Sequence, residues 1–277
     1  MKYILVSFSL LVLTNCGGAT PLPSFSEDDF NNNLTQPDEN NSADLQRGGN
    51  LTALVLGTQS TTASSVVNTI NVSKNVAETV NIFGTSVPVQ NGVQLIGGTL
   101  DTSYRHVATT GEFIYTITGI EYDSAALVGI TTHSSDIPRS GSAQFVGTAQ
   151  AVLDTNLGSF EMVNGQAQIS ANFASQLTTA NVTLSNFEIN STSLTNAATP
   201  VDEIRITNLT GLRGATLNGG HAQFYLDGQR QTTLGDVMTE DSTAAFFGVE
   251  TGQPAEFGGV HAATFQNGSV EVIYSGK

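Results

Sequence analysis

The sequence has no tryptophan and a single cysteine, Cys16, among 277 residues. One cysteine cannot form a disulfide within the chain, so an extracellular fold would have to be held together by its hydrophobic core. Basic residues are also scarce, because nine Lys and Arg stand against 24 Asp and Glu, for a formal charge of −15 at pH 7. This shortage of positive charge argues against binding to nucleic acid or to an anionic membrane surface.

Long helical patterns are lacking as well. Few windows keep a helical spacing of apolar residues for more than two turns. Short alternating segments are instead separated by clusters of Gly, Ser, Thr and Asn. This composition is typical of strands joined by tight turns, so we expect an all-β protein.

The first residues indicate a targeting segment. Residues 1–15 contain an apolar run, Tyr3–Leu13, that is too short to span a bilayer, and we interpret them as a signal peptide. The following Leu13-Thr-Asn-Cys16 resembles the lipobox of bacterial lipoproteins. The resemblance implies that Cys16 is lipidated and that, with Gly17 after it, the chain is sorted to the outer membrane. An unmodified cysteine behind an ordinary secretory signal is the alternative.

Residues 16–50 have no sustained apolar period and contain Pro, Gly, Asn and the acidic run Glu27-Asp28-Asp29. Such a segment buries too little apolar surface to offset the entropy of ordering, so we predict a disordered tether. As a flexible coil it would hold the folded part roughly 30 Å from the lipid. The acidic run lacks the ligand spacing of a calcium loop, and we expect no metal site there.

Strand patterns begin at Leu51. Five segments before residue 138 are predicted to be strands: Leu51–Leu56, Val66–Val72, Val76–Phe83, Val93–Leu100 and Glu112–Tyr122. Asn91-Gly92 predicts a hairpin turn. The last of these segments has apolar residues on both faces, which predicts a strand covered on both sides. A turn-rich stretch around Pro138 predicts a boundary between residues 51–137 and 138–277.

Beyond Pro138 the alternation is cleaner. Five segments carry it: 143–153, 166–173, 182–187, 203–209 and 222–227. Their inner faces mix small residues with Phe, as the narrow interior of a small barrel requires. Roughly eight strands with short turns in this half predict an antiparallel up-and-down β-barrel, whose closure removes exposed strand edges.

The final hairpin gives the most specific expectation. Asn267-Gly268 is the dipeptide preferred in a type I′ turn, where both central residues need φ > 0. With that turn, His261 pairs with Tyr274 and both point inward. The inward set is then His261, Ala263, Phe265, Val270, Val272 and Tyr274. We expect His261 to be a buried histidine hydrogen-bonded to the tyrosine hydroxyl or to the backbone, with a ligand to iron or haem as the alternative.

Three stretches resemble the C-terminal barrel of the transferrin-binding protein B-like family, which includes factor H-binding protein and haemophilin-like surface lipoproteins. They are Arg139–Leu153, Gly165–Phe173 and Phe246–Phe265. In the last, Phe246-Phe247-Gly248, Ala255, Glu256, Gly258 and Gly259 match the family's tail motif, while Val249 and His261 depart from it. The resemblance implies an eight-stranded barrel at 138–277, a strand-rich handle-like domain at 51–137, display on a Gram-negative cell and a binding function. It transfers no ligand.

Candidate ligand residues lie before the barrel. Tyr104-Arg105-His106 falls between predicted strands, and His133 falls at the predicted junction. Tyr104, His106 or His133 could supply an axial ligand to haem, and Arg105 a cation for a propionate. Ligand sites also often form between domains. Exposed polar loop residues are the alternative. No histidine pair has metal-ligand spacing, and no nucleophile elbow, phosphate loop or zinc-protease motif is present, so we expect no metal and no enzyme.

These observations favour a monomeric, surface-exposed outer-membrane lipoprotein that binds a host or environmental protein or haem, haem being a ligand and not a cofactor. A structural or adhesive surface lipoprotein without a small ligand is one alternative. A lipocalin-like carrier of an apolar molecule is another, although the small residues of the inner faces leave little room for it.

Overall fold

The computed structural model describes residues 51–59, 65–71, 73–74, 79–90, 93–95, 98–100, 107–110, 112–156, 158–191, 201–212, 214–232, 234–250 and 252–277. Every regular element in these ranges is a strand. No helix within them is long and apolar enough to cross a membrane. The predicted signal peptide, Cys16, the tether and the Asn91-Gly92 turn lie outside the described residues.

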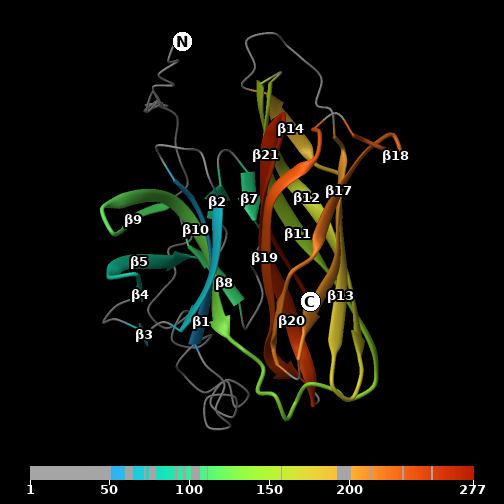
Figure 1. The fold of residues 1–277 in the computed structure, drawn as a ribbon. Helices are drawn as coiled ribbons and strands as arrows, with labels where there is room; N and C mark the ends of the chain where they lie inside the picture. Colours follow the sequence, from blue (N-terminus) through green and yellow to red (C-terminus); the bar gives the residue numbers. More distant parts are fainter. Residues whose placement is uncertain are drawn as a thin grey trace, which may run out of the picture.

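The N-terminal strands form an 8-stranded antiparallel sheet in the order β2-β1-β10-β8-β5-β4-β3, with β9 paired to β10 (Figure 1). Their bounds are β1 Leu51–Gln59, β2 Ser65–Asn71, β3 Ser73–Lys74, β4 Thr79–Ile82, β5 Thr85–Gln90, β8 Val107–Thr110, β9 Phe113–Ile117 and β10 Ile120–Ile130. The predicted strand at Val93–Leu100 is instead a separate pair, β6 (Val93–Leu95) and β7 (Gly98–Leu100). β1 and β10 are buried over most of their length because both of their faces are covered.

The predicted single strand Glu112–Tyr122 is wrong. It is a hairpin in which β9 and β10 meet at Thr118-Gly119 and Ile117 pairs with Ile120. The backbone φ is 52° at Thr118 and 82° at Gly119, as a type I′ turn requires. The apolar residues on both faces of the segment therefore belong to two strands, and threonine at the first turn position hid the turn.

The second sheet is a closed barrel. Its strands run in the order β13-β12-β11-β21-β20-β19-β16-β15, and the pairing of β13 with β15 closes the ring (Figure 1). Their bounds are β11 Gly141–Thr155, β12 Gly158–Phe173, β13 Thr178–Ser185, β15 Glu203–Gly211, β16 Thr216–Asn218, β19 Val237–Glu250, β20 Gln253–Phe265 and β21 Gly268–Gly276. Three further strands extend the sheet: β14 Glu188–Ser191, β17 His221–Leu226 and β18 Gln229–Arg230. The predicted fold class, a strand-rich N-terminal region followed by an eight-stranded antiparallel barrel, is confirmed.

Side chains fill the barrel. The alternation expected for β11 and β12 places their apolar residues inside, in one cluster with those of the other barrel strands. Four aromatic rings meet at its centre, with ring centroids between 4.9 and 5.9 Å apart: Phe145, Phe173, Phe246 and Phe257. Small residues such as Ala149 and Ala167, both fully buried, make room for these rings.

The predicted register of the last hairpin is wrong by two residues. The turn is Gln266-Asn267 and Phe265 pairs with Gly268, so His261 faces Val272. A slip of two residues keeps every side chain on the same face of a strand. The predicted inward set is therefore still inward, and the apolar members of that set lie in the barrel core.

Contacts with neighbouring segments explain this register. Gln266, Asn267 and Gly268 are not among the residues with positive φ. Gly268 is needed for space, because a Cβ there would overlap the carbonyl oxygen of Asp154 on β11. The amides of Gln266 and Asn267 donate to the carbonyls of Asp236 and Leu234, at 3.1 and 3.0 Å.

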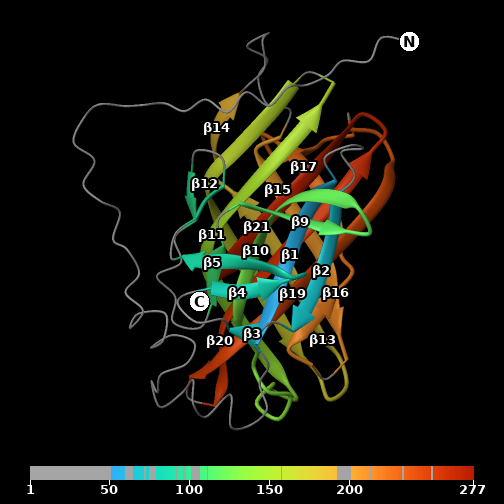
Figure 2. The same cartoon turned by 90° about the vertical axis from the view of Figure 1, so that its left-hand side faces the viewer.

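The N-terminal sheet packs on the outside of the barrel, where β1 and β2 lie across β19, β20 and β21 (Figure 2). An apolar layer joins the two parts: Leu54, Leu56, Val107 and Leu127 from the sheet meet Ala245, Phe247, Val260, Ala262 and Ile273 from the barrel. Two barrel carboxylates add polar contacts. Glu256 accepts the amide of Val107 at 2.9 Å, and Glu271 accepts the hydroxyls of Thr58 and Ser65. The outer face of the last hairpin is thus an interface.

Candidate functional site

The backbone ladder of the barrel is interrupted between β17 and β19. β16 pairs with β19 as far as Asn218 opposite Thr243. Gly219 and Gly220 then adopt φ values of 71° and 115°, and β17 continues beside β15 without pairing to β19. Among the described strands, residues 237–242 of β19 pair only with β20. We call this gap, between residues 221–222 and 237–242, the seam.

Glu240 bridges the seam with its side chain. One carboxylate oxygen accepts the backbone amide of Ala222 at 2.6 Å, and the other lies 3.0 Å from Nδ1 of His221. The Glu240 side chain is 10% exposed, whereas that of His221 is 72% exposed. A side chain therefore takes the place of ladder hydrogen bonds, which keeps a buried amide satisfied.

His261 lies behind Glu240 on the inner face of β20. It is fully buried, and its Nε2 is 3.5 Å from Glu240 Oε1. Neither ring nitrogen has a hydrogen-bond partner. Burial, with a smaller contribution from the charge of His221, lowers the pKa of His261 to about 3. The imidazole is therefore neutral at pH 7, and its contact with Glu240 is not an ion pair.

The expected burial of His261 is confirmed, but its expected hydrogen bond is wrong. Tyr274 pairs with Gly259, two residues from His261, and its hydroxyl has no hydrogen-bond partner. The ring of Tyr274 occupies the space that a Cβ at Gly259 would fill. Burial raises the pKa of Tyr274, so its hydroxyl stays protonated. The two side chains share the barrel interior without bonding to each other.

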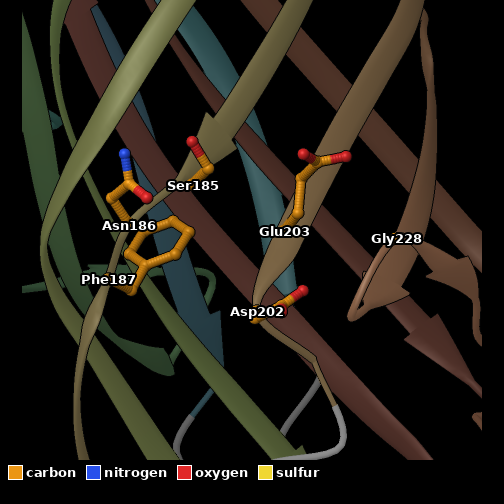
Figure 3. A pocket seen from close by; sticks show the side chains of 6 residues that line it. All are labelled: Ser185, Asn186, Phe187, Asp202, Glu203 and Gly228. Carbon is orange, nitrogen blue, oxygen red and sulfur yellow. The ribbon is translucent and has the colours of Figure 1, made fainter.

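A small cleft opens at one end of the barrel, with a volume of about 240 Å³ (Figure 3). Its lining comes from the loop after β13, the start of β15 and the turn after β17: Ser185, Asn186, Phe187, Asp202, Glu203 and Gly228. Asp202 accepts the amide of Asp227 at 3.0 Å, and Glu203 pairs with Arg205. Arg205 also lies 4.0 Å from the ring centre of Tyr225. Both carboxylates are therefore engaged by neighbours on their own strands and turns.

His133 lies between the two sheets, in the stretch that connects β10 to β11. Its Nδ1 is 2.9 Å from the hydroxyl of Ser135 and accepts the amide of Ser135 at 3.3 Å. A second cleft of about 280 Å³ adjoins this stretch, lined by Ser134, Ser135, Ile137, Pro138, Arg139, Ala174, Ser175 and Thr178. Tyr104, Arg105 and His106 lie outside the described residues. The ligand roles of Tyr104, His106 and His133 stay predictions.

Within the described part of the chain, no group of three or more His, Cys, Asp and Glu is placed to hold a metal ion. The seam was not expected from the sequence, although Gly219-Gly220 inside a strand pattern is the kind of signal that marks a bulge or a close approach. No sequence pattern marks His221 and Glu240. Their contact depends on the point where the chain leaves β19 after β16.

No protein-family model and no curated protein matches the sequence. Among solved structures, intact Ap-TbpB with its N and C lobes is 15% identical, with 81% of this chain and 45% of that chain covered and a TM-score of 0.49. A transferrin binding protein B double mutant from Haemophilus parasuis Hp5 is 14% identical, with 81% and 44% covered and a TM-score of 0.49. A surface lipoprotein is 13% identical, with 83% and 98% covered and a TM-score of 0.42.

This chain spans less than half the length of the first two proteins. Those two are transferrin binding proteins B, the family that the barrel motifs resemble. The architecture of this chain rests on its own strand pairings, and the likeness adds nothing about a ligand.

Proposed function

We propose that this chain is a lipid-anchored surface protein of the outer membrane that binds a protein partner through its outer surface. The observation that carries the proposal is the filled barrel. Apolar side chains from all of its strands occupy the interior, and the four central rings touch one another. A ligand must therefore be met outside the barrel.

The size of the clefts supports a protein partner over a small molecule. The two clefts have volumes of about 240 and 280 Å³. Sites for small molecules and cofactors usually enclose about 300–1,000 Å³. A lipocalin-like carrier is disfavoured because apolar side chains fill the barrel interior. Haem is the second candidate, because His133 adjoins the larger cleft and Arg139 lines it, but haem would have to lie on the surface.

The proposal includes the organisation of the chain. Residues 1–15 are removed, Cys16 is lipidated, residues 16–50 form the tether, and the units at 51–137 and 138–277 are displayed as a monomer. We assign the protein a binding role and no enzymatic one. A tether of this length lets a binding surface reach beyond the lipid headgroups.

Anchoring and display can be tested on cells that produce the chain. Metabolic labelling with palmitate should mark the wild type and leave Cys16→Ala unlabelled. Protease added to intact cells should digest the wild-type protein. Full protection from protease, with the outer membrane intact and a known surface protein digested, would contradict surface display.

Binding can be tested with photo-crosslinking side chains at exposed apolar positions of both parts, such as Ile114, Leu212 and Met238. On intact cells in host fluid or spent medium, at least one position should give a discrete adduct that excess unlabelled chain suppresses. No adduct at any position would sink the proposal. A haem titration separates the second candidate, because a saturable Soret band that His133→Ala abolishes would favour haem over a protein.

A further inference from the structure

Three strands of the N-terminal sheet, β2, β3 and β9, have an edge without a partner among the described strands, and the edge of β9 lies in the middle of the sheet order, beside β10. β9 pairs with β10 only. β8, which precedes it on the same side of β10, is paired to β5 as far as Thr110 opposite Val89. Beyond that pair β5 and β9 separate, and Figure 1 shows them splayed at the side of the sheet away from the barrel. Among the described strands, none pairs with the outer edge of β9.

The turn determines which backbone groups face this edge. A two-residue hairpin turn is closed by a hydrogen-bonded pair, here Ile117 and Ile120. Hydrogen-bonded and non-hydrogen-bonded pairs alternate along an antiparallel ladder. The pairs at Ile114 and Thr116 are then the non-hydrogen-bonded ones. Their N–H and C=O groups point away from β10, toward the open edge.

One face of β9 carries Ile114 and Thr116, and both side chains are exposed, Ile114 to 58%. The opposite face is anchored, because Tyr115 is buried between the rings of Phe83 and Tyr122, with centroids 4.7 and 5.0 Å away. A strand held in this way loses little entropy when a partner strand is added.

Acidic side chains lie along this hairpin. Glu112 and Asp123 are exposed, and the described residues between 107 and 138 include no Lys or Arg. Glu161 of β12 extends the acidic region onto the barrel. Its pKa is raised by burial and by the nearby charge of Glu112. A positively charged ligand would be attracted to this region before contact.

We propose that the open edge of β9 takes up an extended basic segment of a protein partner as an added strand. The backbone groups of Ile114 and Thr116 supply the hydrogen bonds, Ile114 supplies apolar contact, and Glu112 and Asp123 select positive side chains. A second copy of this chain is the wrong occupant, because two β9 hairpins edge to edge would bring like carboxylates together. The inference rests on the proposed function and names the kind of segment that is bound.

The test uses the full chain purified in detergent and an acetylated fluorescent peptide of alternating Lys and Val, with an alternating Glu and Val peptide as its control. Anisotropy should show saturable binding of the basic peptide alone. Thr116→Pro removes an N–H that the ladder to β10 does not use, and we expect the dissociation constant to rise about tenfold. Asp123→Asn should raise it about threefold, and the same charge change at Asp227, in the turn after β17, should leave it unchanged.

A second measurement protects the test if Thr116→Pro fails to fold. The basic peptide N-methylated at alternate residues cannot form the ladder and should lose binding to the wild type. Absence of binding by the basic peptide, equal binding of the acidic peptide, or indifference to both Thr116→Pro and N-methylation would overturn the inference. A partner that crosslinks on cells and is unaffected by Thr116→Pro would remove the β9 inference and leave the proposed function standing. Peptide binding without any partner adduct on cells would support the β9 inference and remove the proposed function.

Discussion

The barrel and the N-terminal sheet are both antiparallel, but they treat their strand edges in opposite ways. In the barrel, the pairing of β13 with β15 closes the ring, and at the seam the carboxylate of Glu240 bonds to β17 where the ladder stops. Among the described strands the N-terminal sheet does not close, and β9 pairs on one side only. A closed sheet is protected from adding strands, whereas an open one offers backbone groups to a partner. This difference fits the proposal that the barrel is the support and the N-terminal sheet is the part that binds a partner.

The hydrophobic cores of the two parts also differ. The barrel has an interior of its own, built from eight strands. The N-terminal sheet has a smaller cluster on one face, and on the other face it shares an apolar layer with the barrel. The stability of the N-terminal sheet thus depends partly on the barrel. The apolar cluster inside the barrel includes no residue of the sheet.

Removal of an aromatic ring from the barrel core is the strongest test of this difference between the two parts. Phe246 is fully buried and meets Phe145, Phe173 and Phe257. Phe246→Ala should lower the free energy of unfolding by about 3–5 kcal/mol. Denaturant unfolding followed by circular dichroism measures it.

A smaller core change in the sheet is Ile82→Val, which deletes one buried methylene and should cost about 0.5–1.5 kcal/mol. The free energy of unfolding of the whole chain should therefore fall more in Phe246→Ala than in Ile82→Val. If Ile82→Val cost as much as Phe246→Ala, the barrel would not be the more stable part.

The next effect concerns protons in the barrel interior. Between a folded pKa of about 3 and the ordinary value of 6.5, the unfolded chain binds a proton at His261 and the folded chain does not. The free energy of unfolding should therefore fall as the pH drops through 6.5, and the loss should continue down to about pH 3. At pH 5 the loss from this group is about 2 kcal/mol.

The His261→Leu variant isolates this contribution, because it removes the titrating group and leaves Glu240 and His221 in place. Its stability between pH 7 and pH 5, from urea titrations, should fall less than that of the wild type. His221→Asn changes an exposed histidine on the same carboxylate and leaves His261 in place, so its loss of stability between pH 7 and pH 5 should exceed that of His261→Leu. Equal slopes for all three proteins would mean that His261 is not held neutral.

Sequence patterns predicted the parts of the fold that depend on local alternation. The inward faces of β11, β12 and the last hairpin follow from apolar residues at every second position, and their burial agrees. The register of that hairpin could not be predicted, because the need for glycine at position 268 comes from Asp154 on a strand distant in sequence.

The candidate site was harder to predict than the scaffold. The Glu240 bridge at the seam depends on the point where the chain leaves β19 after β16. β9 was hidden because Thr118 occupies a turn position that usually holds Asn, Asp or Gly. His261 was singled out for its inward position alone, without its neighbour Glu240. Alternation in the sequence predicts which face of a strand a residue occupies. A site depends on the distances between side chains of different strands, which alternation does not predict.

The two hairpin glycines give a smaller test of the same comparison. A Cβ at Gly268 in the barrel meets backbone, so both Gly268→Ala and Gly268→Asn should destabilise by about 1–3 kcal/mol. A Cβ at Gly119 in the β9–β10 turn meets nothing within 4 Å, and only its φ of 82° resists a side chain. Gly119→Ala should cost about 1–2 kcal/mol, and Gly119→Asn should restore most of it. Rescue by Asn at 268 would show that φ, and not space, matters there.

The smallest effect sharpens the comparison at the interface itself. Glu256 is buried beneath the sheet and accepts the amide of Val107. Glu256→Gln keeps an acceptor but removes its charge, which should weaken the contact by about 1 kcal/mol. Hydrogen exchange should then speed up in β8 and β1, while β11 and β12 on the barrel remain protected. Faster exchange in the barrel strands as well would mean that the two parts open together, and that the sheet is a structural part of the barrel and not a separable recognition surface.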